Sequence, residues 1–261
     1  KTDLSVFRPS EGDWHVNRSS AGFFGIHFGL IGDIPIPGDY DGDGKTDFAV
    51  FRPDPDEMNP THFILNSSTN TVSYAYWGLQ TDGDGKTDVS VYRSSNNTFY
   101  ISQSSGGTQA LNFGAFGDLP MFMDYEGDGR SNIAVFRQGT GTWYIAKPTG
   151  VPAQNFYAIP FGQFGDMPVP ADYDRDNKDD VAVFRPSSGI WYLLQSTSGF
   201  GAQSFGLSGD VPVPGDYDGD GEDDIAVYRD GIWYLDQSTA GFAAFNYGLG
   251  SDIPIPKTYI P

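Results

Sequence analysis

The sequence predicts an all-β protein, a six-bladed β-propeller of four-stranded blades, on three observations. A set of short segments recurs six times at intervals of roughly 44 residues, which is a typical spacing for propeller blades. Aromatic residues make up 15% of the chain and lie among 34 glycines and 18 prolines, as in short strands joined by turns. No segment shows sustained helical periodicity. We therefore expect residues 1–261 to form a single domain.

Each repeat contains three consecutive strand-like segments. The first is apolar and ends in arginine, and its copies, with the acidic residues before them, start at Lys1, Lys45, Lys86, Arg130, Lys178 and Glu222. The second is rich in aromatic residues and is expected to return as the partner strand of a hairpin; its copies start at Trp14, His62, Phe99, Trp143, Trp191 and Trp233. The third is an outer strand that ends in an aromatic residue and glycine, at Phe28, Trp77, Phe113, Phe161, Phe205 and Tyr247.

The fourth segment, "GDIPIPGDY" or a variant, is predicted to be the innermost strand. It recurs at Asp33, Asp118, Asp166, Asp210 and Asp252. Because the chain starts at the tail of an acidic loop, Ile253 to Pro256 are expected to provide the first strand of the N-terminal blade. This pairing of the C-terminal strand with the N-terminal blade would close the ring and leave no open sheet edge.

One repeat departs from the pattern between Gly78 and Asp82, where the chain is about eight residues shorter than in the other repeats. Either that blade lacks its inner strand or residues are missing from the sequence. The regular "DGDGKTD" that follows favours missing residues.

Composition excludes several classes of partner. The 34 acidic and 15 basic residues give a formal charge of -19, which argues against nucleic acid and anionic membrane surfaces as partners. No apolar run is long enough to span a bilayer, so no membrane insertion is expected. The absence of cysteine fits a fold stabilised by cations in place of disulfides.

Acidic residues at alternate positions of glycine-containing loops predict calcium sites. Carboxylates this close repel one another unless a cation lies between them, and oxygen ligands on alternate loop residues are how Ca²⁺ is bound. The alternative is an ordinary solvated β-turn rich in Asp and Gly. Repetition at fixed spacing favours calcium, in a structural role that holds neighbouring strands and neutralises clustered carboxylates.

The loop pattern Asp-x-Asp-x-Asp-Gly-x-x-Asp before an apolar strand, together with Phe-Gly pairs, resembles the FG-GAP or VCBS repeat of integrin α-subunit propellers and bacterial surface proteins. The resemblance covers nearly the whole chain. It implies a β-propeller with calcium in the loop between the first and second strands of a blade, about four to five ions here. Such propellers are usually extracellular and adhesive; some relatives are lectins, and others occur beside polysaccharide-degrading domains.

Carried over residue by residue, the resemblance implies five metal loops in which the residue before the last of each set, namely Lys45, Lys86, Arg130, Lys178 or Glu222, contributes its backbone carbonyl. The sets are Asp39, Asp41, Asp43, Lys45 and Asp47; Asp82, Asp84, Lys86 and Asp88, with Gln80 at the first position; Asp124, Glu126, Asp128, Arg130 and Asn132; Asp172, Asp174, Asp176, Lys178 and Asp180; and Asp216, Asp218, Asp220, Glu222 and Asp224.

Departures from the loop pattern lead to three expectations. Glu126 and Asn132 should lower calcium affinity in their loop. Asn177 stands where glycine is usual and is expected in a left-handed conformation. At the ring closure Asp3 stands alone beside Lys257 and Thr258, so no metal site is expected there.

Other repeated residues have both a functional and an architectural interpretation. The six arginines could form a ring of ligand-binding cations, but each is more simply expected to bind an acid of its own blade, such as Asp33 or Asp166. The repeated tryptophans could stack on sugars, but are expected in the core between blades. The residues are Arg8, Arg52, Arg93, Arg137, Arg185 and Arg229, and Trp14, Trp143, Trp191 and Trp233.

Recognition is expected from outer-strand aromatic residues that do not follow the repeat, namely Phe23, Phe24, Tyr74, Tyr76, Phe156 and Tyr157. The three histidines, His15, His27 and His62, show neither metal-ligand spacing nor a catalytic triad.

Together these features predict an extracellular or cell-surface recognition propeller, a monomer or part of a larger surface protein, whose partner is a glycan or an extracellular protein. Catalysis is not expected, because the paired acids are committed to calcium. The alternative is a carbohydrate-active enzyme, such as a polysaccharide lyase, or its carbohydrate-binding module. A glycan array and a turnover assay on acidic polysaccharides would distinguish these functions.

Overall fold

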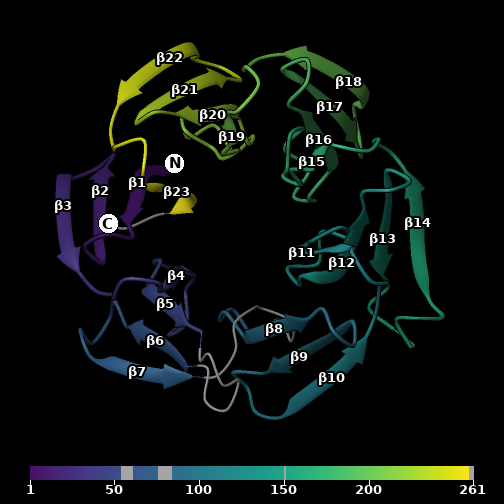
Figure 1. The fold of residues 1–261 in the computed structure, drawn as a ribbon, viewed down its shortest axis with the longest axis horizontal. Helices are drawn as coiled ribbons and strands as arrows, with labels where there is room; N and C mark the ends of the chain where they lie inside the picture. Colours follow the sequence, from purple (N-terminus) through teal and green to yellow (C-terminus); the bar gives the residue numbers. More distant parts are fainter. Residues whose placement is uncertain (54–60, 76–83, 150, 259–261) are drawn as a thin grey trace.

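Six small antiparallel sheets surround a central opening, so the chain is a six-bladed β-propeller, as predicted (Figure 1). The computed structural model describes all residues except 54–60, 76–83, 150 and 259–261. No helix occurs in the described residues, and therefore none that could cross a membrane.

Five of the six blades have four described strands each. From the centre outward, blade 1 consists of β23 (Ile253–Thr258), β1 (Asp3–Arg8), β2 (Asp13–Arg18) and β3 (Gly22–His27). Blade 2 consists of β4 (Ile34–Pro35), β5 (Phe48–Arg52), β6 (Thr61–Leu65) and β7 (Val72–Ala75). Blade 4 consists of β11 (Leu119–Met123), β12 (Asn132–Arg137), β13 (Thr142–Ala146) and β14 (Phe156–Pro160). Blade 5 consists of β15 (Met167–Pro168), β16 (Val181–Arg185), β17 (Ile190–Gln195) and β18 (Gly199–Ser204), and blade 6 of β19 (Val211–Pro212), β20 (Ile225–Arg229), β21 (Ile232–Gln237) and β22 (Gly241–Asn246).

Blade 3 differs from the other blades. Its described strands are β8 (Val89–Arg93), β9 (Thr98–Ser102) and β10 (Thr108–Asn112), so the described sheet has three strands where four were predicted. The inner strand of this blade would lie in the shortened repeat, of which residues 76–83 are outside the described part of the chain. Whether residues are missing between Gly78 and Asp82 concerns a segment outside the described residues.

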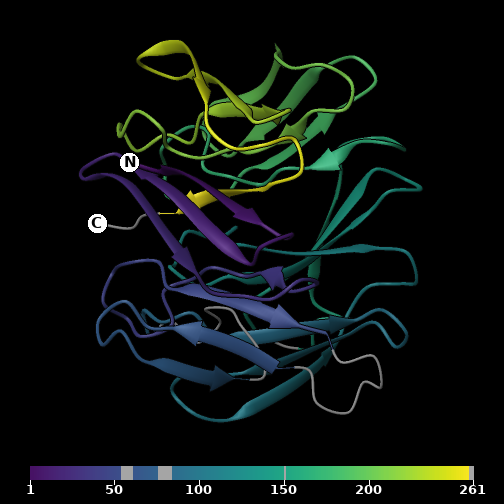
Figure 2. The same ribbon diagram turned by 60° about the vertical axis from the view of Figure 1, so that its left-hand side comes forward.

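The ring closes through the two ends of the chain, as predicted. β23 pairs antiparallel with β1, with Phe7 opposite Ile253 and Ser5 opposite Ile255. Figure 2 shows the two strands side by side, and Figure 1 places both of them in blade 1. The pairing covers an edge of β1 that would otherwise be exposed.

The core lies between the blades. Each of five buried apolar clusters combines side chains of two neighbouring blades; one joins Phe136 and Trp143 of blade 4 to Val181 and Val183 of blade 5. The four repeated tryptophans, predicted to lie between blades, are at most 1% exposed. Each donates its indole N–H to the carbonyl of the aromatic residue before the outer-strand glycine, as from Trp143 to Phe161 at 2.9 Å.

A close backbone approach explains the repeated aromatic and glycine pair. The turn after β12 passes over the end of β14, and a Cβ atom on Gly141 would lie 2.2 Å from the carbonyl oxygen of Gly162. Gly162 itself has a φ of +133°, which disfavours other residues. The same pair of glycines meets in blades 1, 5 and 6.

Candidate functional site

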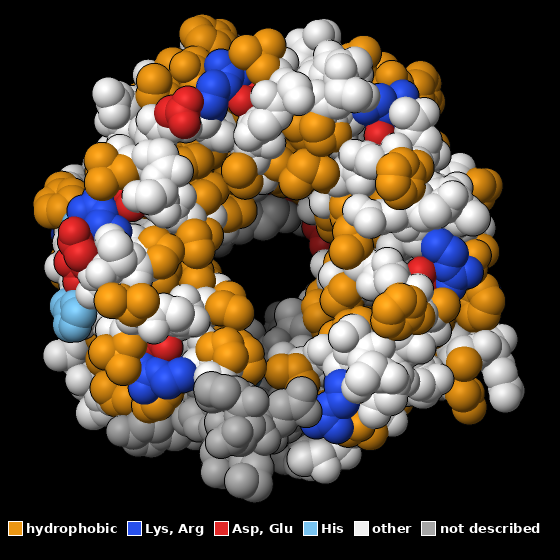
Figure 3. All heavy atoms as spheres, in the orientation of Figure 1, with side chains coloured by type: hydrophobic (Ala, Val, Ile, Leu, Met, Phe, Trp, Pro, Cys, Tyr) orange, Lys and Arg blue, Asp and Glu red, His pale blue; other side chains and the backbone are white. Residues whose placement is uncertain are grey.

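The acidic loops and the turns that follow the third strands lie at the same face of the propeller. In blade 5 the loop from Asp172 to Asp180 joins β15 to β16, and its carboxylates contact Ser196 and Thr197 in the turn between β17 and β18. Figure 3 shows the opposite face, where acidic side chains are sparse and occur mostly beside Lys or Arg. The molecule therefore has an acidic-loop face and a second face of different chemistry.

The blade 5 loop brings three of its four predicted carboxylates together, and Asp176 is not in the converging group. Ligand oxygens of Asp172, Asp174 and Asp180 lie within 4.8 Å of one another. Asp176 accepts hydrogen bonds from the Lys178 N–H at 3.0 Å and from Ser196. The chain turns tightly enough because Asn177 has a φ of 65°, which confirms the left-handed conformation predicted for it.

The last carboxylate of each complete loop is buried. Asp47, Asp180 and Asp224 are at most 1% exposed, and each accepts backbone N–H groups from its own loop and from the neighbouring turn. Burial raises the pKa of Asp180 to about 7 and also raises the pKa values of Asp47 and Asp224. Ionising these groups therefore costs free energy that a neighbouring cation would offset.

The other loops match the prediction to different degrees. Two further groups converge within 4.8 Å, Asp39 with Asp41 and Asp43, and Asp216 with Asp218 and Asp224. In the blade 4 loop Asn132 donates its amide to Glu126 and to the carbonyl of Ala146, so part of the ligand set is bonded internally. In the blade 3 loop Asp84 and Asp88 both accept a bond from the Ser104 hydroxyl, whereas Asp82 lies outside the described residues.

Two carboxylate oxygens test whether these loops fit a metal ion. Asp174 Oδ1 and Glu126 Oε1 are screened from solvent and have no hydrogen-bond partner among the described residues. A buried carboxylate oxygen without a donor is unfavourable, and a hard cation binds oxygen ligands of this kind. The donor set of the complete loops consists of oxygen atoms, so the residues fit Ca²⁺.

The loops also connect neighbouring blades. The backbone N–H of Asp179 donates to the carbonyl of Asp124 at 2.8 Å, and the Asp179 carboxylate accepts the Asp124 N–H at 2.8 Å. Asp223 and Asp172 repeat this exchange between blades 5 and 6. At the ring closure Thr2 N–H donates to the carbonyl of Asp216. Acidic loops of neighbouring blades are thus hydrogen-bonded to one another.

The site predicted to be absent at the ring closure has retained one structural feature. Asp3 is 2% exposed and accepts the Ser19 N–H at 2.6 Å, as the last carboxylates of the other loops do with their serines. Asp3 therefore keeps the hydrogen-bonding role of these carboxylates.

On the opposite face five of the six repeated arginines bind aspartates of their own blades, as predicted. In blade 3, Arg93 lies over the ring of Tyr100 and donates to its hydroxyl at 3.4 Å, and the described residues show no aspartate partner for it. Arg52 donates two bonds to Asp33 at 2.8 Å, and Arg185 donates two to Asp166 at 2.8 and 2.9 Å. The remaining pairs are Arg8 with Asp252, Arg137 with Asp118 and Arg229 with Asp210. These hydrogen bonds raise the pKa values of the arginines. These five ion pairs stabilise the architecture, and the arginine side chains remain partly exposed.

Each of these aspartates closes a tight turn, here called a tip turn, between one blade and the next. In the turn 30–33, Asp33 N–H donates to the carbonyl of Leu30 at 3.1 Å, and the Asp33 carboxylate accepts the Leu30 N–H at 2.9 Å. Gly32 has a φ of 92°, as a type II turn requires at its third position. The other tip turns span residues 115–118, 163–166, 207–210 and 249–252.

The second residue of a tip turn points into solvent. Ile31 is 81%, Phe116 90% and Phe164 79% exposed, whereas Ser208 and Gly250 occupy this position in the other two turns. Sequence reasoning missed these tip residues. The signal was available as an apolar residue between the aromatic-glycine pair and the Gly-Asp of the next strand.

The outer-strand aromatic residues predicted for recognition only partly meet that expectation. Phe24 packs against the core and stacks on Phe48, and Tyr157 packs on Tyr125, so both serve the core. Phe23 is 66% exposed but is not unique to its blade, because Phe200 and Phe242 follow the equivalent glycines and are each 67% exposed. Phe156 is 37% exposed. Tyr74 lies on β7, and Tyr76 lies outside the described residues.

Two of the three histidines, which show no metal-ligand spacing in the sequence, lie beside carboxylates in the structure. His27 Nδ1 lies 2.6 Å from Asp13 Oδ1, and His15 lies close to Asp13 and Glu11. The antiparallel register of β2 and β3 places Asp13 opposite His27. His62, in contrast, is 3% exposed inside blade 2, and burial lowers its pKa to about 4.

Solved structures with a similar fold include proteins of different activities. A lectin of Agrocybe aegerita that specifically recognises non-reducing terminal N-acetylglucosamine superposes with a TM-score of 0.58 at 16% identity, over 94% of this chain and 75% of that one. A streptogramin B lyase superposes with a TM-score of 0.52 at 12% identity, over 82% and 68% of the two chains. Virginiamycin B lyase from Staphylococcus aureus gives 0.55 at 8% identity, over 95% and 85%. No family model and no curated protein sequence matches the chain. At these identities the similarity shows the propeller fold, which both binding proteins and enzymes use.

Proposed function

We propose that this chain is a calcium-stabilised recognition propeller of the FG-GAP or VCBS kind, secreted or displayed at a cell surface, that binds a glycan through its tip turns. The observation that carries the proposal is the exposure of Ile31, Phe116 and Phe164 on rigid turns. Large apolar side chains on rigid turns of one face offer contact area to a ligand at little cost in conformational entropy.

The tip turns have the rigidity that recognition requires. Each is closed by a backbone hydrogen bond, and its aspartate is fixed by two hydrogen bonds from an arginine. A side chain on such a turn loses little conformational freedom when a ligand binds, which favours affinity. Loops on a fixed scaffold commonly carry binding functions.

A glycan is the favoured partner for two reasons. The Phe116 and Phe164 rings present flat apolar surfaces on which the apolar face of a sugar ring can stack, and charged Arg and Asp side chains beside them can bond hydroxyl groups. A propeller of similar fold is a lectin for N-acetylglucosamine. The tip position is apolar at three described turns and small at two, so we expect binding on one side of the ring.

Calcium would act structurally at the acidic-loop face. The carboxylates of Asp39, Asp41 and Asp43, and of the corresponding residues in blades 5 and 6, would hold the ion together with oxygens of the same loops. When bound, calcium neutralises the clustered carboxylates and holds each loop in one conformation. Because the loops exchange hydrogen bonds between blades, this would stabilise the whole ring.

A glycan array probed with the calcium-loaded chain tests the proposal. Phe116→Ser and Phe164→Ser should preserve the turn, because serine already occupies this position in the tip turn between blades 5 and 6, as Ser208. We expect both to weaken glycan binding about tenfold or more, as loss of an aromatic contact residue does. Phe242→Ser, which removes an exposed phenylalanine on an outer strand, should leave binding unchanged.

Two results would contradict the proposal. Binding of a protein ligand without any glycan would assign the face to protein recognition, and turnover of an acidic polysaccharide would support the enzyme alternative. The fold alone does not separate these functions, since lyases share it.

A further inference from the structure

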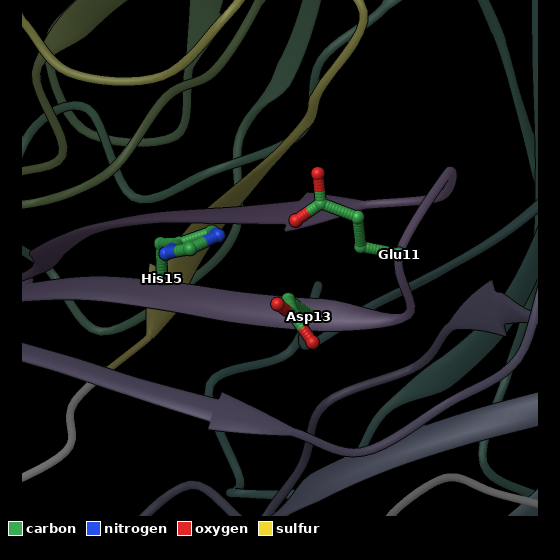
Figure 4. Close-up of side chains that lie close together, drawn as sticks. All are labelled: Glu11, Asp13 and His15. Atoms are coloured by element: carbon green, nitrogen blue, oxygen red, sulfur yellow. The ribbon is translucent and has the colours of Figure 1, made fainter.

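Side chains with metal-ligand chemistry lie together in blade 1, away from the acidic loops. Asp13 and His15 are two residues apart on β2 and so point to the same side of the strand, and Glu11 lies in the turn before them. One ligand atom of each lies within 4.8 Å of the others. Figure 4 shows the two carboxylates and the imidazole turned toward a common space. His27 approaches from β3 and contacts Asp13.

The His15 imidazole has an unused ligand atom. Its Nε2 is screened from solvent and has no hydrogen-bond partner among the described residues. The ring is held in place by stacking on Phe23, with a centroid distance of 6.1 Å. A buried nitrogen without a partner is unfavourable, and a bound metal ion would satisfy it.

The other blades show that propeller packing does not require these residues. At the position of His15 they carry an aromatic ring that lies beneath the arginine of the same blade, namely Phe63, Tyr100, Tyr144, Tyr192 and Tyr234. At the position of Asp13, opposite that arginine, they carry Thr61, Thr98, Thr142, Ile190 and Ile232. At the position of His27, four of them carry Asn112, Pro160, Ser204 and Asn246. Three ligand-type substitutions therefore occur at neighbouring positions of one blade.

We propose that Glu11, Asp13 and His15 form a site for a divalent metal ion of the transition series, represented by Zn²⁺. Zinc binds imidazole nitrogen and carboxylate oxygen, and sites with three protein ligands keep a position for water or a ligand atom. A nitrogen ligand distinguishes this site from the acidic loops, whose oxygen ligands suit calcium. His27 orients the Asp13 carboxylate, a role that hydrogen-bonded neighbours of metal ligands commonly have.

The local charge favours a dication. Three carboxylates lie here, those of Glu11, Asp13 and Asp252. They are partly balanced by the Arg8 guanidinium, which bonds Asp252 at 3.0 Å and lies 3.6 Å from Glu11. The two carboxylates in excess would be neutralised by one ion of charge two. Glu11 is half exposed, so the ion has a path from solvent.

The test is a titration of the full chain with Zn²⁺ and Co²⁺ in saturating Ca²⁺, which keeps oxygen-only sites occupied. We expect one ion per chain by calorimetry, and for Co²⁺ a visible absorption band with a nitrogen ligand. His15→Tyr and Asp13→Thr install the residues of the other blades and should weaken binding roughly 100-fold or more; His27→Asn should weaken it about 10- to 100-fold. His62→Phe is the matched control and should bind as the unaltered chain does.

Thermal melts in calcium check that each variant is folded. The proposal is overturned if the unaltered chain binds neither ion in saturating calcium, or if folded His15→Tyr or Asp13→Thr binds as tightly as the His62→Phe control. Both readouts are independent of glycan binding, so failure of this site and failure of the recognition face are distinguishable.

Discussion

Replacing Asp180 with asparagine should change the thermal stability of the chain little in chelator but substantially in calcium. Asp180 is 1% exposed, accepts the Ser196 N–H at 2.7 Å and the Tyr173 N–H at 3.0 Å, and its pKa is raised to about 7 by burial. In chelator, Asp180→Asn removes one acceptor, a cost of about 1 kcal/mol, but it also removes a buried charge. The two effects oppose each other, so the chelator-treated variant should melt close to the unaltered chain.

In calcium the same substitution should cost much more. A site filled at a free calcium concentration 100 times its Kd stabilises the folded chain by about 2.7 kcal/mol. For a chain of this size about 1 kcal/mol shifts the Tm by roughly 2–4 °C. Loss of the blade 5 site should therefore reduce the calcium-induced rise in Tm by about 5–10 °C.

The chain offers a reciprocal variant and a charge-matched control. Asn132→Asp restores the carboxylate in the blade 4 loop, and we expect it to increase the calcium-induced rise. Asp230→Asn, in an exposed turn outside the acidic loops, changes the net charge as Asp180→Asn does and should leave the rise unchanged. The assay is thermal unfolding by calorimetry in chelator and in calcium. If Asp180→Asn kept the full calcium-induced rise, the assignment of its loop as a metal site would be refuted.

Three further predictions concern the architecture. Gly141→Ala should destabilise the chain by at least 2 kcal/mol, on the order of a strained backbone contact, because its Cβ would lie 2.2 Å from Gly162; unchanged denaturant unfolding would contradict the close approach. Arg185→Lys should cost about 1–3 kcal/mol in the same assay, because lysine cannot replace the two parallel bonds to Asp166. Arg130→Lys is the control and should cost less than about 0.5 kcal/mol, because Arg130 is exposed and three other loops carry lysine at its position. His62 has a pKa of about 4 in the folded chain and a higher pKa when unfolded, so the unfolded chain binds the proton first and stability is lost as the pH falls from about 6.5 to 4. His62→Phe should remove about 3 kcal/mol of that loss. An unchanged pH profile of stability would contradict burial of His62 as the cause of the loss.

Much of the architecture could be predicted because the same segments recur in the same order, so each strand and loop assignment is supported by several copies. One Asp-rich loop or one aromatic segment is weak evidence, but six copies in the same order define the blade. The binding of Arg52 to Asp33, the interblade position of Trp143 and the pairing of β23 with β1 all follow from repeat position.

Features that depend on register or on exposure could not be predicted in the same way. His15 and His27 are twelve residues apart, and only the antiparallel pairing of β2 with β3 brings His27 opposite Asp13. The face on which an outer strand is buried was not assigned, so Phe24 and Tyr157 were mistaken for exposed residues. The exposure of Phe116 and Phe164 depends on turn geometry, which the spacing between repeats does not define.

The most direct test of the account is calcium titration by calorimetry on the chelator-stripped chain, with thermal melts in parallel. We expect at least three binding events, one for each described loop whose carboxylates converge, and a large rise in Tm. Absence of calcium binding together with an unchanged Tm would contradict it, because the acidic loops would then be ordinary turns on a propeller stabilised by its core alone.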